Sequence, residues 1–212
     1  GGDHFSAFAG ESAFHVEVDQ GCEFALTADM LSPELDLQLQ AAWDKETSKF
    51  VDFNTFIPVR TPRGRVIYTK AIVTAQFDAK GDFLTKKVRI VMGGDKQLEV
   101  PEDLATFNPD FHLLAFCAQF AASSKYDVVT MDVVSAFLHS PLNEDVYARF
   151  TPQIAEHFCR ICPDYGRFRQ PDGSLVVKLL KSVYGLRQSP IEFQKYTTTQ
   201  LAKHGFIPSD MA

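Results

Sequence analysis

Two β-branched segments separated by a short turn sequence are the strongest constraint on how this chain can fold. Apolar side chains roughly alternate with polar ones over residues 66–77, and a second run rich in valine and isoleucine covers residues 83–91. The intervening Ala79-Lys80-Gly81-Asp82 has the composition of a turn. Together these segments predict a β-hairpin.

Two helices are predicted on either side of that hairpin along the chain. Ser32 followed by Pro33 and Glu34 is typical of an N-cap and first turn, and an apolar stripe continues the helix to about Phe50. Asn108-Pro109 opens an apolar segment, Phe111 to Ala122, whose length and alanine content favour a buried helix over a strand.

A third helix and two short strands are predicted near the C-terminal end. Ser189-Pro190-Ile191-Glu192 has the pattern of a capping box, and the helix that it starts should run to His204 with Gly205 as its stop. Short strands are predicted at 146–150 and 175–180, separated by a polar insertion at about 151–173. Because helices and hairpins alternate without a strict βαβ rhythm, the predicted fold class is α+β.

One acidic residue, Asp132, lies in a third β-branched run, Val128 to Val133, which predicts another strand. A carboxylate is costly to bury in such a run unless another group pairs with it. Taken alone, an acid near a strand end is more often a structural cap or turn former than a catalytic group. The surrounding sequence favours the functional interpretation.

Asp132 belongs to the stretch TMDVVSAFLHSPLNEDVYARF, which is followed after an insertion by VVKLLKSVYGLRQSP. The two stretches, in this order, resemble the polymerase signature of copia-type retrotransposon reverse transcriptases, close to QMDVKTAFLNGxLxExVYMxxP and VxKLxKSLYGLKQSPRxW. Three further blocks resemble the family: Ala42-Trp43 to Glu46 with Asn54-Thr55-Phe56 and Pro58-Val59; Lys87 to Val91 with Gly94, Asp95 and Gln97; and Thr106 to Pro109. The similarity covers about residues 42–210.

The resemblance implies the fingers and the first part of the palm of a right-hand polymerase, an antiparallel sheet with packed helices. Residues 42–107 are expected to be fingers-like, and residues 108–212 to form a partial palm that carries the insertion. Residues 1–41 are expected to be an acidic, phenylalanine-containing N-terminal extension.

The resemblance also implies roles for single residues. In the family, nucleotidyl transfer uses two divalent ions, Mg²⁺ or Mn²⁺, held by several carboxylates. Asp132 matches the first catalytic and metal-binding carboxylate, and the backbone carbonyl of Val133 would supply a further oxygen ligand. Seven residues match nucleotide-binding positions: Lys87, Arg89, Ala136, Phe137, Tyr184, Gly185 and Gln188. Lys87 and Arg89 would hold the triphosphate, and Phe137 would exclude a 2′-hydroxyl.

The family's remaining catalytic carboxylates lie in a YxDD hairpin, and the sequence stops at Ala212 before such a hairpin could begin. The fold is therefore expected to be truncated before the YxDD hairpin, and this chain alone is expected to be inactive. Departures from the family motifs also remove positive charge where template and primer would run.

Two functions from different classes therefore stay open. The first is an RNA-directed DNA polymerase that acts on a primer-template and a deoxynucleoside triphosphate when the missing part of the palm is present. The second is a domesticated, non-catalytic module in a larger assembly, whose truncated palm would need a protein partner to cover its exposed sheet edge and apolar surface.

The charge distribution, the hydropathy and the cysteine content further limit the possible classes of protein. Residues 1–50 carry ten acidic residues against two lysines, a net charge of −8, within a chain whose net charge is −6, so the rest is only weakly basic. No apolar run has the length of a membrane span, and the first residues lack the basic-then-apolar order of a signal peptide, so neither a membrane span nor a signal peptide is expected. Cys159 and Cys162, in the sequence CRIC, are expected to be reduced thiols on a surface insertion rather than metal ligands. This cysteine usage favours a reducing, intracellular compartment.

Overall fold

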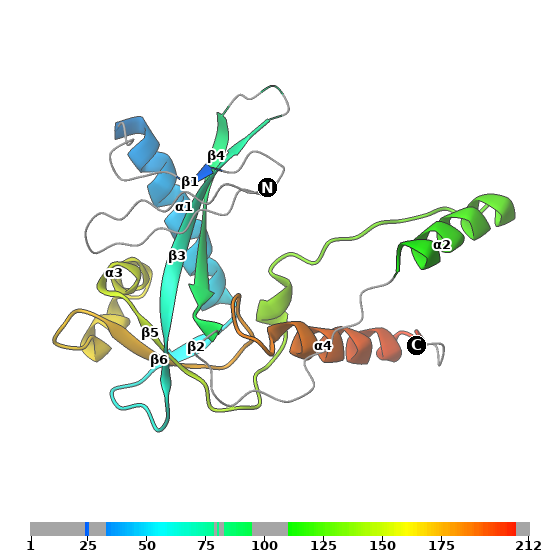
Figure 1. Ribbon diagram of the computed structural model, residues 1–212. Helices are drawn as coiled ribbons and strands as arrows, with labels where there is room; N and C mark the ends of the chain where they lie inside the picture. The colour runs from blue at the N-terminus through cyan, green and yellow to red at the C-terminus, as the bar shows by residue number, and fades with distance from the viewer. Residues whose placement is uncertain (1–23, 26–32, 79, 81–82, 95–109, 207–212) are drawn as a thin grey trace, which may run out of the picture.

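The computed structural model describes residues 24–25, 33–78, 80, 83–94 and 110–206, which form a mixed β-sheet and several helices (Figure 1). The strands are β1 (Phe24–Ala25), β2 (Phe56–Pro58), β3 (Val66–Phe77), β4 (Phe83–Met92), β5 (Tyr147–Phe150) and β6 (Leu175–Leu179). The helices are α1 (Pro33–Asp52), α2 (Phe111–Ser124), α3 (Pro152–Ile161) and α4 (Ser189–Lys203), with 3₁₀-helices η3 (Ala136–His139) and η4 (Pro163–Phe168). The α+β prediction is confirmed. The expected extension at 1–41 lies mostly outside the described residues.

The predicted hairpin is present as β3 and β4, which pair antiparallel with Val73 opposite Val88. The sheet continues in the order β1-β3-β5-β6-β2, with β4 paired to β3. The expectation of a purely antiparallel sheet is wrong in one place, because β3 pairs parallel with β5. A parallel pair needs a long connection between its strands, and here residues 78–146 supply it.

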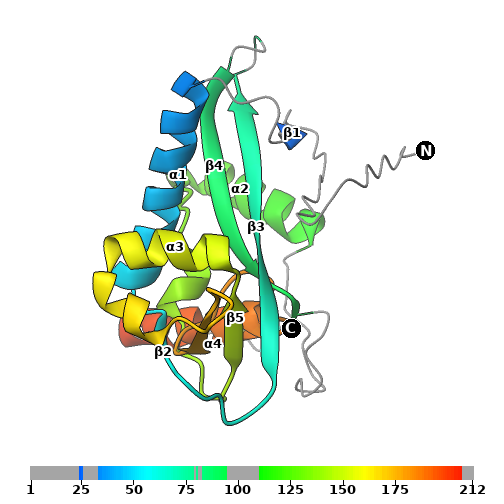
Figure 2. The same ribbon diagram turned by 90° about the vertical axis from the view of Figure 1, so that its left-hand side faces the viewer.

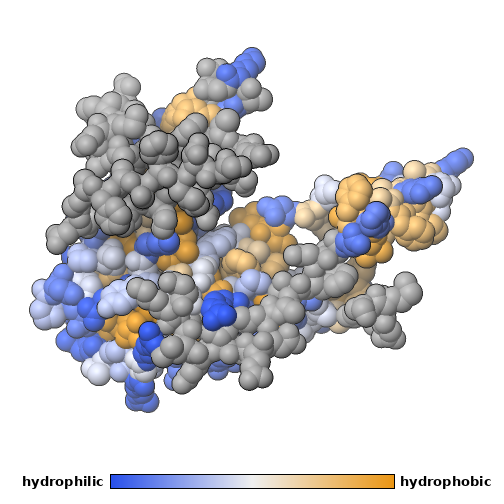
Figure 3. Space-filling model, in the orientation of Figure 1, coloured by the Kyte–Doolittle hydropathy of each residue, from blue (hydrophilic) through white to orange (hydrophobic). Residues whose placement is uncertain are grey.

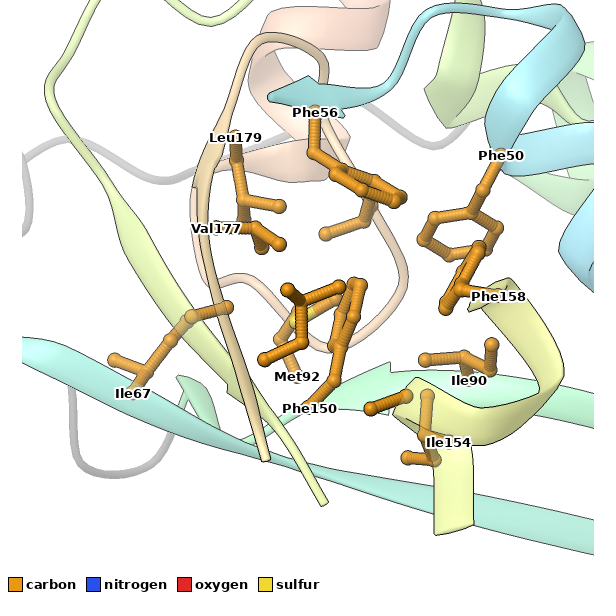
Figure 4. Close-up of a cluster of buried hydrophobic side chains, with 14 of the residues drawn as sticks. Phe50, Phe56, Ile67, Ile90, Met92, Phe150, Ile154, Phe158, Val177 and Leu179 are labelled. Carbon is orange, nitrogen blue, oxygen red and sulfur yellow. The ribbon is translucent and has the colours of Figure 1, made fainter. Parts of the chain in front are cut away.

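A cluster of four phenylalanine rings forms the centre of the core (Figure 4). Phe50 of α1, Phe56 of β2, Phe150 of β5 and Phe158 of α3 are each at most 5% exposed. The rings of Phe150 and Phe158 stack with centroids 4.8 Å apart, and Phe56 meets both edge-on. One continuous core thus joins side chains from the regions expected to be fingers-like and palm-like.

Helix α1 contributes to this core through a regular stripe of buried residues at Ala42, Trp43, Glu46, Thr47 and Phe50. This spacing places them on one face of a helix. Figure 2 shows α1 and α3 on the same side of the long hairpin. The Trp43 ring stacks on His157 of α3 at 4.1 Å, which fixes the two helices against each other.

The sequence predicts a polar insertion at 151–173, and the prediction of a polar segment is wrong for its first half. Most of that half is helix α3, which contributes buried apolar residues to the core. Ile154, Ala155 and Phe158 are buried on one face, and the Thr151 hydroxyl accepts a hydrogen bond from the Ile154 amide as an N-cap. Polar residues between the apolar ones conceal the i, i+1, i+4 spacing. Cys159 and Cys162 are half-buried in this packed element rather than lying on a surface insertion.

The apolar segment at 111–122 is helical as predicted, but the expectation that it is buried is wrong. Helix α2 has no buried residue, and Figure 1 shows it as an arm extending away from the sheet. Apolar surface gathers over it in Figure 3. The most exposed large apolar side chains of this arm and the segment that follows are Phe111, Phe116, Tyr126, Val128, Val129, Met131 and Val134.

The predicted strand at 128–133 is also absent, and residues 126–133 are extended without regular structure. A strand forms only where another strand accepts and donates backbone hydrogen bonds. Among the described residues no strand pairs with this segment.

The predicted helix near the C-terminal end is present as α4, and Gly205, with a φ of +85°, follows its last turn as expected. Its capping box is not formed. The Ser189 hydroxyl donates instead to the Val183 carbonyl at 2.6 Å, tying the helix start to the preceding turn. Of the helices that the structure describes, none is long and apolar enough to cross a membrane.

Candidate functional site

Most of the residues predicted to bind nucleotide converge around the C-terminal end of β4. Arg89 and Lys87 lie on β4, Phe137 lies in η3, and Tyr184 and Gly185 lie in the turn between β6 and α4. These three segments are adjacent near the centre of Figure 1. The predicted site is thus assembled from parts of the sequence almost a hundred residues apart.

The turn at Tyr184 and Gly185 is fixed tightly against β4. The Met92 amide donates a hydrogen bond to the Tyr184 carbonyl at 2.7 Å. Gly185 has a φ of +89°, and a Cβ atom there would overlap the Met92 carbonyl oxygen and lie 2.6 Å from the Val91 Cγ1 atom. Only glycine combines this conformation with so close an approach of two backbones.

Phe137 forms the aromatic wall of the site. Its ring centroid lies 5.4 Å from that of Tyr184 and 6.1 Å from that of Phe193 in α4, both in edge-on contacts. Burial of Leu138, the next residue, anchors η3 to the core. Ala136 is half-buried beside Phe137. The half-buried Phe137 ring is therefore held in place while keeping part of its surface accessible.

Electrostatic interactions at Tyr184 link Asp132 to β4. Burial raises the pKa of the Tyr184 phenol above its usual value, the negative charges of Glu46 and Asp132 raise this pKa further, and the Arg89 guanidinium lowers it. A charge affects a pKa in this way only when it is nearby. Arg89 and Asp132 therefore both act on the same phenol.

These interactions predict opposite effects of two substitutions on the pKa of Tyr184. Asp132→Asn is expected to lower this pKa, because it removes a negative charge that disfavours the phenolate. Arg89→Ala is expected to raise the pKa, because it removes the stabilising cation. NMR titration of ¹³C-labelled tyrosine rings would measure both shifts.

Tyr165 is the internal control for that titration, since burial also raises its pKa and neither Asp132 nor Arg89 contributes to the shift. Its titration should be the same in both variants. Shifts of Tyr184 in the same direction in the two variants would contradict the described geometry.

Asp132 itself is exposed on the extended segment, and Val133 follows it with its side chain 47% exposed. No three His, Cys, Asp or Glu side chains among the described residues gather closely enough to hold a metal ion. One carboxylate and one carbonyl do not fit a pair of divalent ions, which require several carboxylates. The metal-binding roles of Asp132 and Val133 therefore stay predictions.

Gln188 is placed differently from the other predicted residues. Its side chain is 1% exposed, and its Nε2 atom donates to a carboxylate oxygen of Glu144 at 3.4 Å. A buried side chain with this contact supports the turn from within. Its nucleotide-binding role stays a prediction.

Glu46 is a residue near the site that sequence reasoning did not single out as functional. It is 3% exposed, accepts a hydrogen bond from the Ile90 amide at 3.2 Å and pairs with Lys49 at 3.1 Å. It thereby ties α1 to β4 and contributes a negative charge near Tyr184. The sequence did contain a signal for Glu46, because an acidic residue within the apolar stripe of a helix is expected to be buried and therefore to need a partner.

Comparison of the sequence with known proteins shows what the chain is similar to. Residues 53–212 match the family model described as reverse transcriptase (RNA-dependent DNA polymerase). A retrovirus-related Pol polyprotein from a transposon of Arabidopsis thaliana is 26% identical over 155 residues, covering 72% of this chain and 10% of that protein. A similar Pol polyprotein from a Nicotiana tabacum transposon is 27% identical over 172 residues, covering 76% of this chain and 11% of that protein.

A truncated transposon Gag-Pol polyprotein of Saccharomyces cerevisiae is 24% identical over 166 residues, covering 76% of this chain and 12% of that protein. The chain thus spans about a tenth of the length of the curated relatives that it matches. No solved structure matches the chain.

Proposed function

The chain belongs to the reverse transcriptases of copia-type retrotransposons, and we propose that it forms the nucleotide-binding part of an RNA-directed DNA polymerase. The supporting observation is that Phe137 of η3 contacts Tyr184, whose turn is hydrogen-bonded to the end of β4, the strand that carries Arg89. In this proposal the substrates are a deoxynucleoside triphosphate and a primer-template.

The triphosphate would be held by the cations of β4. Lys87 and Arg89 alternate with buried Val88 and therefore share the face of the hairpin opposite α1. The side chain of Val91, on the same face, lies beside Gly185. A guanidinium can donate two parallel hydrogen bonds to phosphate oxygens, so Arg89 is suited to orient the triphosphate.

The sugar and base of the nucleotide would lie against the paired rings of Phe137 and Tyr184. An aromatic side chain fixed by its neighbours can exclude a 2′-hydroxyl by steric overlap, which is the role proposed for Phe137. In this proposal the small side chain of Ala136 leaves room for the sugar beside the rings, whereas Gly185 serves to let the turn pack directly against β4. Nucleotidyl transfer itself is proposed only for a protein in which further carboxylates join Asp132.

Arg89→Ala tests this proposal directly in the chain itself. Binding of dTTP, measured by isothermal titration calorimetry, is expected to weaken about ten- to a hundredfold, because one charge-assisted contact is worth about 1.5–3 kcal/mol. Lys80→Ala, at the exposed end of the same hairpin, is the matched control and should leave the affinity unchanged. Equal affinity of the Arg89→Ala variant and the original chain would contradict the proposed site.

A second candidate function is a non-catalytic module that binds another protein. The exposed apolar side chains of α2 and residues 126–134 favour it, because exposed apolar patches of this kind mark interaction sites. Under this alternative, the original chain does not bind dTTP measurably, and the Arg89→Ala variant gives the same result. The calorimetric experiment therefore separates the two functions.

A further inference from the structure

Five exposed arginines lie on two loops at the lower left of Figure 1, away from the candidate nucleotide site. Loop 59–65 joins β2 to β3, and loop 163–173 comprises η4 and the turn before β6. We define the arginine surface as Arg60, Arg63, Arg65, Arg167 and Arg169. Neither the family resemblance nor the proposed function uses these residues.

The two loops are held together by specific contacts. The Gln170 side-chain amide donates to the Arg60 carbonyl at 3.3 Å and so joins the loops, and the Val59 amide donates to the Val176 carbonyl at 2.9 Å, which fixes the start of loop 59–65 to β6. Phe168 is half-buried beneath two guanidinium groups, with Arg167 at 5.1 Å and Arg60 at 5.9 Å from its ring centroid. One aromatic ring thus brings a cation from each loop into a single cluster.

The contact with Phe168 uses no hydrogen-bond donor of Arg60 or Arg167, whereas Arg169 donates its Nε–H to the Gly173 carbonyl at 2.9 Å. A guanidinium lying over an aromatic face uses its π-surface for the contact and keeps its N–H groups free at the edge. Between described residues, no ion pair involves any member of the arginine surface. Arg149 and Lys178, which lie nearby, are instead paired with Asp172 and Asp145.

The local charge is opposite in sign to that of the whole chain. The chain has a net charge of −6, but no Asp or Glu occurs between Asp52 and Asp78. In loop 163–173 the acids are Asp164 and Asp172, and Asp172 is engaged by Arg149. A local positive excess in an acidic protein indicates a polyanion-binding surface.

We propose that the arginine surface binds the phosphate backbone of single-stranded RNA. A flexible single strand can follow two loops on a curved surface, whereas reading a duplex usually requires an element that enters a groove. The guanidinium groups that Phe168 holds can also stack with unpaired bases. This site is separate from the nucleotide site and does not depend on the function proposed for it.

The test measures binding of a fluorescein-labelled oligouridylate of about twelve nucleotides by fluorescence anisotropy, without nucleotide and over a series of salt concentrations. For single strands, log K falls with log salt with a slope of about −0.7 for each phosphate contacted. The double variant Arg60→Ala/Arg167→Ala is therefore expected to reduce the slope by about 1.4 and to bind more weakly at low salt.

Two further variants make this result specific. Arg60→Lys/Arg167→Lys keeps both charges and should retain most of the slope, which separates loss of phosphate contacts from loss of folding. Lys195→Ala/Lys203→Ala removes the same charge from α4 and should leave RNA binding unchanged. The Arg60→Ala/Arg167→Ala variant should also keep its dTTP affinity. A failure of the RNA-binding proposal can therefore be distinguished from a failure of the proposed nucleotide site.

Three outcomes would overturn the inference: no salt-dependent RNA binding by the original chain, the same slope in the Arg60→Ala/Arg167→Ala variant, or DNA duplex or phosphatidylserine vesicles bound as tightly as the RNA.

Discussion

Gly185→Ala is expected to destabilise the protein by about 3 kcal/mol or more, because it combines backbone strain with overlap of packed atoms. The φ of Gly185 is +89°, and the added Cβ would overlap the Met92 carbonyl oxygen and crowd Val91. The Met92 carbonyl belongs to the β4 backbone, which the hydrogen bond from the Met92 amide to the Tyr184 carbonyl holds against the turn, so it cannot easily move aside. Urea unfolding followed by circular dichroism would measure the loss.

Substitutions at two other glycines separate the contribution of backbone strain from that of atomic overlap. Gly205 also has a positive φ, +85°, but an added Cβ would meet nothing within 4 Å. Gly205→Ala should therefore cost only the backbone term, about 1–2 kcal/mol. Gly166→Ala, where nothing lies within 4 Å, should change stability little. A cost for Gly185→Ala no greater than that for Gly205→Ala would contradict the close approach of the turn to β4.

Phe158→Ala is expected to have a comparable or larger effect, about 3–5 kcal/mol, because it leaves a cavity in the aromatic core. Phe158 is fully buried and its ring contacts those of Phe50, Phe56 and Phe150. Since these rings come from α1, β2 and β5, the cavity would loosen every layer of the core. Thermal and urea unfolding would both show the change.

Phe111→Ala is the matched control, because Phe111 is 76% exposed at the start of α2. The same truncation there should change the free energy of unfolding by less than about 0.5 kcal/mol. If Phe111→Ala proved as destabilising as Phe158→Ala, the description of α2 as an exposed arm would be wrong.

Patterns local in the sequence predicted most of the regular structure. The hairpin of β3 and β4, helices α1 and α4, and the strands at Tyr147–Phe150 and Leu175–Leu179 follow from periodicity, proline and glycine. Such elements satisfy most of their backbone hydrogen bonds within a short stretch of chain or with an adjacent strand. The prediction of a capping box at Ser189 is wrong, because the Ser189 hydroxyl donates its hydrogen bond to the Val183 carbonyl outside the helix.

Burial and long-range pairing were less predictable. The composition of α2 predicts burial, yet burial depends on what lies beside a helix, and no element among the described residues covers it. The extended segment at 126–133 has strand propensity without a described partner strand. In α3 the opposite error occurred, because four polar residues interrupt the apolar ones and conceal three buried residues at helical spacing.

For the candidate site, family resemblance located the residues and the structure showed how they meet. The motif containing Tyr184 and the motif containing Asp132 predict proximity only through the resemblance, since nothing in their spacing requires it. The contacts of Gly185 with β4 depend on the folded backbone, and the role of Glu46 depends on tertiary hydrogen bonds. Neither could be inferred from residue type alone.

Photoaffinity labelling with 8-azido-dATP, followed by peptide mass spectrometry, tests the central claim most directly, because it locates bound nucleotide on the chain. The account predicts adducts on the segments that carry Phe137 and Tyr184, suppressed by excess dATP and reduced in the Arg89→Ala variant. Labelling that excess dATP does not suppress, or that lies mainly on other segments, would contradict a nucleotide site at the end of β4.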